Sequence, residues 1–121
     1  MSDPAIRVYG LKNCDSCRRA VKWLRAAGQG FAFIDVRADD LIRADVARIV
    51  AGAGADKTLN RKSTTWRQLS DHQRKVSTDQ DVVDLIVQHP TLLKRPVIEL
   101  VDEFIVGFAA AEQADLVARL A

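Results

Sequence analysis

The chain has 121 residues, of which 48% are hydrophobic and 28% charged, and its formal net charge is +2. This composition predicts an ordinary soluble globular domain. No apolar run approaches the roughly 20 residues that cross a bilayer, and the first residues lack the basic and apolar regions of a signal peptide. We therefore expect a cytoplasmic protein with no membrane contact. In that reducing compartment its two cysteines are expected to be free, catalytic or metal-bound rather than permanently disulfide-bonded.

The first third of the chain predicts a strand, a helix and a second strand. Ile6–Tyr9 is apolar enough for a short strand, and a helical pattern begins near Cys14 or Asp15 and stops at Gly28. The residues at helical spacing are Cys17, Val21, Leu24 and Ala27. Phe31–Val36 is nearly all apolar, as expected of a buried parallel strand. Together these elements form a βαβ unit.

The middle of the chain is expected to be helical. The apolar spacing predicts one helix over 42–52 and a short one over Ala55–Leu59, whereas Lys62–Leu69 is polar and irregular. Thr78 is expected to cap a strong helix over Asp79–Gln88, because threonine is a preferred N-cap and aspartates follow it. The buried side of that helix should carry Val82, Val83, Leu85 and Ile86. Pro90 then breaks the chain.

The last segment predicts a hairpin and a helix. Val97–Val101 and Phe104–Val106 flank a tight turn, and Ala109–Leu120 is amphipathic, with Leu116, Val117 and Leu120 expected to face inward. The complete order is βαβ, a helical insertion, then ββα. We therefore predict an α/β protein of thioredoxin-like fold, with residues 1–121 forming a single domain and the insertion covering about 40–94.

Cys14 and Cys17 form a Cys-x-x-Cys pair between the first strand and the first helix. Unpaired N–H groups at a helix start stabilise a thiolate, and the basic residues Lys12, Arg18 and Arg19 add to this field. A lowered pKa would make Cys14 nucleophilic near neutral pH. Cys17 follows one turn later, where it could resolve a mixed disulfide by forming a reversible bond with Cys14.

Two other interpretations of the pair remain open at this point. Cys17 could be a small buried apolar residue on the helix face rather than a resolving thiol. A zinc site would need about four ligands, and only His72 and His89 could join the cysteines, at no recognisable spacing. We therefore expect no metal.

Basic residues gather in two segments, at 12–25 and 57–75. Solvated helix faces explain most of them, although the two segments could converge on an anionic ligand. The few aromatic residues are not interleaved with the basic ones, so direct binding of nucleic acid is not expected.

Four stretches resemble the arsenate reductase (ArsC) family, and they follow its order along the chain. They are Val8-Tyr9-Gly10-Leu11-Lys12-Asn13-Cys14-Asp15, Asn60-Arg61-Lys62-Ser63-Thr64-Thr65-Trp66-Arg67-Gln68-Leu69, His89-Pro90-Thr91-Leu92-Leu93-Lys94-Arg95-Pro96-Val97-Ile98 and Val106-Gly107-Phe108. The resemblance covers nearly the whole chain. It implies a thioredoxin-like fold with a helical insertion, the same fold that the pattern predicts.

The resemblance also implies roles for individual residues. Cys14 takes the place of the family's nucleophile, and Arg61 and Arg95 take the places of two anion-binding arginines. Arg95-Pro96 matches the position of a cis proline beside the site. Lys12 and Asn13, directly before the nucleophile, are expected to contribute to the same anion site. Two guanidinium groups would hold an oxyanion or an anionic thiol by bidentate hydrogen bonds.

Three functions follow from the branches that the chain resembles. Arsenate reductases carry a third arginine near the end of the hairpin, where this chain has Val106-Gly107-Phe108. The segment around Trp66 is most similar to the YffB-like branch, so the first expectation is a thiol–disulfide oxidoreductase with glutathione as co-substrate and no bound cofactor. The second is an arsenate reductase linked to glutathione and glutaredoxin. The third is an Spx-like redox-sensing regulator that binds the RNA polymerase α subunit, which Cys17 favours.

Overall fold

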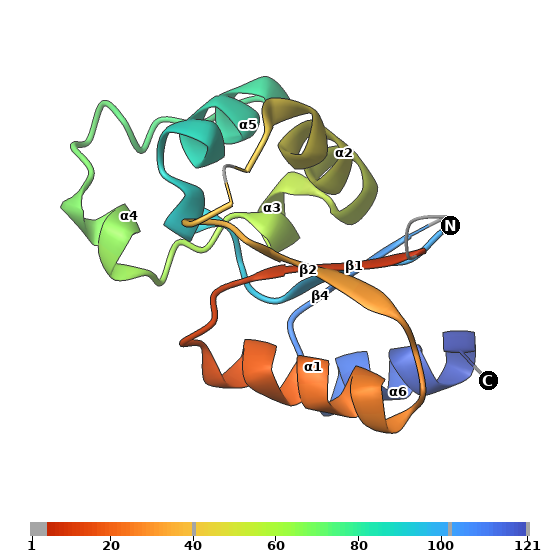
Figure 1. Cartoon of the computed structure of the whole chain (residues 1–121). Coiled ribbons are helices and arrows are strands. Elements are labelled where there is room, and N and C mark those ends of the chain that lie inside the picture. The colour runs from red at the N-terminus through yellow and green to blue at the C-terminus, as the bar shows by residue number, and fades with distance from the viewer. Residues whose placement is uncertain (1–4, 40, 102, 121) are drawn as a thin grey trace. The chain divides into compact units, whose positions relative to one another are not determined.

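The structure, a computed structural model, describes residues 5–39, 41–101 and 103–120. Its internal contacts divide the chain into two units (Figure 1). The sheet unit comprises Met1–Asp35 and Arg95–Ala121, and the helical unit comprises Val36–Lys94. The helical unit therefore occupies the part of the chain where the sequence predicts an insertion. That both units form a single domain stays a prediction.

The sheet unit contains four strands in the order β2-β1-β3-β4. They are β1 (Ile6–Gly10), β2 (Phe31–Asp35), β3 (Val97–Glu99) and β4 (Phe104–Val106). β1 pairs with β2 in parallel and with β3 in antiparallel, and β3 and β4 form the predicted antiparallel hairpin. This βαβ and ββα order around one mixed sheet confirms the predicted α/β, thioredoxin-like fold.

Two helices lie on one face of this sheet, α1 (Asp15–Ala26) and α6 (Ala110–Leu120) (Figure 1). The core between them and the strands consists of Ile6, Val8, Ala20, Leu24, Ile98, Leu100, Ile105, Phe108 and Leu116. Leu116 is fully buried as predicted, and Leu120 packs against this core. The prediction for Val117 was wrong, because its side chain is 56% exposed. Only one stripe of α6 can face the sheet, and Leu116 occupies it.

β2 differs from its prediction in burial but not in direction. It is parallel to β1, yet Phe31, Ala32, Phe33 and Ile34 are only partly buried. The reason is its place in the sheet: β2 is an outer strand with β1 on one side. A run of apolar residues predicts a strand, but it does not tell an edge position from a central one.

The helical unit contains α2 (Arg43–Ala53), α3 (Ala55–Thr58), α4 (Thr64–Gln68), α5 (Asp79–Gln88) and the 3-10 helix η1 (Pro90–Leu92). α2 packs against α5, and all four residues predicted for the inner side of α5 are buried. No helix among the described residues is long and apolar enough to span a bilayer.

Two predicted elements need correction. The segment Lys62–Leu69, expected to be irregular, contains α4, because the Ser63 hydroxyl accepts a hydrogen bond from the Trp66 amide at 3.1 Å and caps the helix start. In the hairpin, β3 ends at Glu99 rather than at Val101, and the Leu100 amide donates to the Glu103 carbonyl at 2.8 Å. Asp102, predicted in the turn, lies outside the described residues.

Thr78 caps α5 as predicted, and we expect Thr78→Ala to destabilise the protein by about 1 kcal/mol. The Thr78 hydroxyl accepts from the Asp81 amide at 3.1 Å, and the Asp81 carboxylate accepts from the Thr78 amide at 3.1 Å. Both donors would otherwise lack a helical partner. Urea unfolding monitored by circular dichroism measures the change. Thr64→Ala, at an exposed threonine that caps no helix, is the control; an equal loss in both variants would contradict the capping role.

Candidate active site

Cys14 occupies the N-cap position of α1, at the end of the loop that follows β1. Its backbone is extended, with φ −98° and ψ 123°, and its carbonyl accepts the first helical hydrogen bond from the Arg18 amide at 2.9 Å. The Cys14 amide in turn donates to the Leu11 carbonyl at 3.2 Å, which closes the loop into a tight turn. The thiol therefore lies at the N-terminus of α1, where backbone N–H groups point outward.

The surroundings of Cys14 lower its pKa below the ordinary value of 9.0. Partial burial of the thiol opposes ionisation and raises the pKa. Backbone N–H groups of Cys17 and Ser16, the Cys17 thiol and the positive charge of Arg95 all favour the thiolate, and together they outweigh the burial. The pKa of Cys14 is thus lowered as the helix start predicts, but the groups that lower it are hydrogen-bond donors and Arg95 rather than Lys12, Arg18 and Arg19.

Cys17 has the opposite character. Its side chain is 1% exposed, and this burial raises its pKa to about 12, against a smaller lowering by a backbone hydrogen bond with Leu11. The interaction with Cys14 raises it further, because a proton on Cys17 serves as donor to the Cys14 thiolate. The pair is therefore polarised: Cys14 is the thiol that ionises more readily, and Cys17 is the one that keeps its proton. Both cysteines are free thiols here, and bond formation on oxidation stays a prediction.

Gly10, at the end of β1, makes room for the buried thiol. A Cβ at this position would lie 2.5 Å from Cys17 Sγ and 3.2 Å from Cys17 Cβ. No real Cβ approaches a heavy atom that closely, so only glycine fits without movement of the cysteine. The sequence interpretation overlooked Gly10; a glycine that ends a strand directly before a Cys-x-x-Cys loop was the available signal.

The other predicted site residues are divided between the sheet unit and the helical unit. Lys12 and Asn13 are exposed in the loop before Cys14, and the Lys12 amide donates to the Asp35 carboxylate at 3.4 Å. The Arg95–Pro96 bond is cis, as the resemblance implies. Arg95 acts on Cys14 through its charge, as described above.

Arg61 belongs to the helical unit, and its position beside Cys14 stays a prediction. Within its own unit, its guanidinium lies 5.7 Å from the centre of the Trp66 ring and 3.5 Å from the exposed Asp56 carboxylate. The arginine side chain is 46% exposed, so this ion pair is weak.

Val106, Gly107 and Phe108 at the end of the hairpin are uncharged, whereas arsenate reductases carry an arginine near this position. Gly107 has φ +93°, a conformation that favours glycine, and its amide donates to the Pro96 carbonyl at 2.8 Å. Phe108 is 5% exposed and belongs to the core. Among the described residues, no group of three or more His, Cys, Asp or Glu side chains is placed to bind a metal.

The family model described as "ArsC family" matches residues 9–116, which include both cysteines, Arg61 and the Arg95–Pro96 bond. The chain belongs to the ArsC family. An uncharacterized protein of Haemophilus influenzae is 37% identical to this ArsC-family chain over 108 residues, which is 88% of this chain and 94% of the relative. The solved structure of a protein named YFFB (PA3664) is 33% identical, with a TM-score of 0.86 over 96% of this chain and 99% of that one. The global transcriptional regulator Spx of Streptococcus pneumoniae is 28% identical over 105 residues, 85% of this chain and 78% of Spx.

Proposed function

We propose that this ArsC-family protein is a thiol–disulfide oxidoreductase that uses Cys14 as nucleophile and glutathione as co-substrate. The observation that carries the proposal is the polarised cysteine pair: the pKa of Cys14 is lowered while that of Cys17 is raised to about 12. A thiolate at a helix start, with a protonated thiol as hydrogen-bond donor, is the form of cysteine that attacks disulfides. Family membership supports this reaction class.

The reaction proceeds by two exchanges. The Cys14 thiolate attacks the glutathione sulfur of a mixed disulfide R–S–S–G, the Cys14–glutathione bond forms, and the R thiolate leaves and takes a proton from water. A glutathione thiolate then attacks the glutathione sulfur of that new bond and releases oxidised glutathione and the Cys14 thiolate. In sum, R–S–S–G and glutathione become R–SH and oxidised glutathione, so glutathione is the reductant. Arg95, and by the family resemblance Arg61, would hold the glutathione carboxylates.

Arsenate is the weaker candidate substrate because of the hairpin end. A compact oxyanion needs convergent charged donors, and losing one costs about 1.5–3 kcal/mol, or roughly tenfold to a hundredfold in affinity. Glycine at 107 and a buried phenylalanine at 108 supply neither a charge nor a side-chain donor there. Glutathione spreads its carboxylates along a longer molecule, so two cations suffice for it.

The test is turnover with each oxidant. We expect the reduced protein to consume the mixed disulfide of glutathione and 2-mercaptoethanol, followed by NADPH oxidation through glutathione reductase, with kcat/KM at least tenfold above that for arsenate under the same conditions. Arsenate reduction that exceeds disulfide reduction, with no measurable glutathione binding, would reverse this ranking.

A redox-responsive regulator is the second candidate. The Cys14–Cys17 hydrogen bond places two sulfurs in contact as a switch requires, and curated relatives are named global transcriptional regulator Spx. A regulator would show no turnover, and its oxidised form would bind the RNA polymerase α subunit in a pull-down that Cys17→Ser abolishes.

A further inference from the structure

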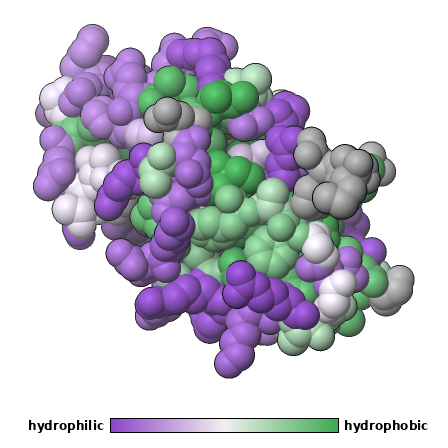
Figure 2. Space-filling view, in the orientation of Figure 1, coloured by the Kyte–Doolittle hydropathy of each residue, from purple (hydrophilic) through white to green (hydrophobic). Residues whose placement is uncertain are grey.

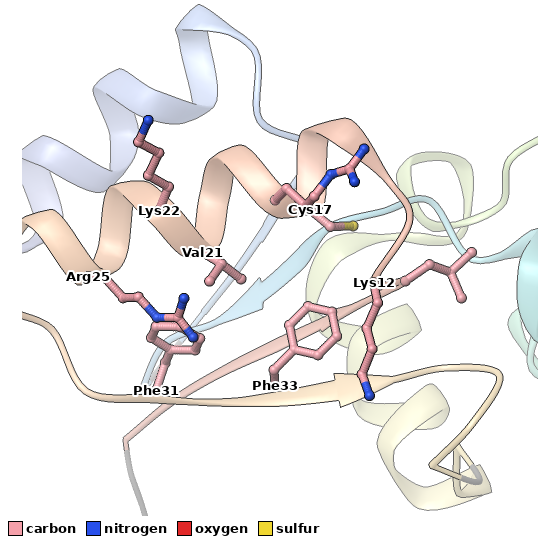
Figure 3. Close-up of a pocket in the computed structure, with 9 residues that line it drawn as sticks. Lys12, Cys17, Val21, Lys22, Arg25, Phe31 and Phe33 are labelled. Carbon is pink, nitrogen blue, oxygen red and sulfur yellow. The ribbon is translucent and has the colours of Figure 1, made fainter.

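A pocket of about 580 Å³ opens between α1 and β2, on the side of the sheet unit next to the Cys14 loop (Figure 3). Its walls come from the loop after β1, one side of α1 and two positions of β2. Phe31, Phe33 and Val21 supply apolar surface, and Cys17 lines it at the end nearest the loop. This volume lies in the usual range for sites that hold a small organic molecule.

The pocket exists because β2 is an outer strand of the sheet. Phe31 and Phe33 point toward α1, where Val21 is the apolar residue of intermediate burial that lines the pocket with them, and both rings stay partly exposed (Figure 3). Pale-green apolar surface is visible over β2 in Figure 2, with hydrophilic side chains of α1 along one side of it. Both rings pack against the core of the sheet unit and keep a partly exposed side in the pocket, which offers an apolar binding surface.

The charges around this apolar surface have one sign. Of the nine described residues that line the pocket, Lys12, Arg18, Lys22 and Arg25 are basic, and none is acidic. Arg25 holds its guanidinium 5.9 Å from the centre of the Phe31 ring, and Lys12 extends past Phe33 at the other end (Figure 3). Arg18 pairs with Asp15 outside the pocket at 2.5 Å, and the Lys22 amine points away from the phenyl rings.

Arg25 and Lys12 are therefore the two cations that flank the phenyl rings of Phe31 and Phe33. The basic side chains would repel a cationic ligand, and an inorganic anion would make no apolar contact with the two rings. The thiol of Cys17 adds no negative charge, because burial raises its pKa to about 12. A ligand complementary to both the phenyl rings and the basic side chains has an aromatic or branched aliphatic body and one anionic group at an end.

We propose that this pocket is a binding site for a small organic anion, an aromatic or branched aliphatic carboxylate or sulfonate, with its apolar body against Phe31, Phe33 and Val21 and its anionic group paired with Arg25 or Lys12. Nothing in this proposal depends on thiol exchange at Cys14. Because the pocket wall includes Cys17, which hydrogen-bonds to Cys14, the bound anion would lie close to the thiol pair.

The first test fills the pocket. The probe is 8-anilinonaphthalene-1-sulfonate, an aromatic sulfonate whose fluorescence rises in apolar surroundings. We expect saturable one-to-one binding to the folded protein and its loss in Val21→Phe, because the new ring occupies the space over Phe31 and Phe33. Val117→Phe is the matched control: the same substitution on α6, at a valine that is 56% exposed and does not line the pocket. Equal binding by both variants would overturn the proposal.

The second test removes one charge. Arg25→Gln is expected to weaken sulfonate binding roughly tenfold, the lower end for loss of a charged partner at a partly exposed site. Arg19→Gln, on the same helix but outside the pocket, should leave it unchanged. Amide chemical shifts should move at Val21, Arg25, Phe31 and Phe33. Equal affinity for a neutral naphthalene alcohol, or shifts spread over the whole chain, would mean unspecific apolar contact and would overturn the assignment. The same binding is expected in Cys14→Ser, so failure of the proposed function and failure of this site are distinguishable.

Discussion

Replacing Cys14 with serine is expected to abolish disulfide reduction, by roughly three orders of magnitude or more in kcat/KM. Serine keeps the shape of the side chain but is not ionised near neutral pH, so the nucleophile is lost. The measurement is turnover of the glutathione mixed disulfide, with circular dichroism to show that the variant folds. Cys17→Ser is the matched control, because the two-exchange route needs only one thiol. Loss of turnover in Cys17→Ser, with turnover retained in Cys14→Ser, would contradict Cys14 as the nucleophile.

The pH dependence of Cys14 alkylation tests the cause of its reactivity. The lowered pKa of Cys14 predicts a rate with iodoacetamide that reaches half its maximum below pH 9.0, while Cys17, with a pKa of about 12, stays unmodified near neutral pH. Arg95→Gln should move the Cys14 midpoint upward, because the charge that favours the thiolate is removed; each pKa unit costs about tenfold in thiolate fraction. Arg19→Gln, an exposed charge on α1, should leave the midpoint in place. Equal midpoints in both variants would show that Arg95 does not act on the thiol.

Gly10→Ala is expected to destabilise the protein by about 1–3 kcal/mol, the usual cost of an overpacked contact. The added Cβ would lie 2.5 Å from Cys17 Sγ, so either the cysteine or the end of β1 must move. The measurement is the free energy of unfolding in urea. Gly30→Ala is the matched control, since a Cβ there meets nothing within 4 Å, and its effect should stay within about 0.5 kcal/mol.

A double-mutant cycle separates this contact from a general intolerance of alanine at the end of β1. In a Cys17→Ala background the sulfur is absent, and the loss caused by Gly10→Ala should shrink by more than half. The two residues are in direct contact, so their effects should not be additive. Strictly additive losses would mean that Gly10 is required for a reason other than the buried thiol.

The sequence by itself determined the elements whose signals are local. α1 and α5 were predicted with their starts, because Cys14 and Thr78 precede runs of helical spacing. At Thr78 the cap chemistry adds a second local signal, since it depends on a neighbour three residues away. The hairpin was predicted for the same reason, and Cys14 as the nucleophile stays a prediction. α4 was missed although its signal is also local: Ser63 is an N-cap residue three positions before Trp66, and the polar composition concealed it.

The tertiary structure decided the exposure of Val117, Phe31 and Phe33, and it decided which groups separate the pKa values of the two cysteines. Val117 and Leu116 are neighbours on α6, yet one is exposed and the other fully buried, because the sheet covers only one stripe of the helix. Phe31 and Phe33 were expected in the interior and instead line a pocket, because β2 lies at the edge of the sheet. The difference between the two thiols likewise arises from packing: Gly10 admits the Cys17 sulfur into the interior, burial keeps its proton in place, and that proton stabilises the thiolate of Cys14. Such effects depend on atoms brought together by folding, which a pattern along the chain does not encode.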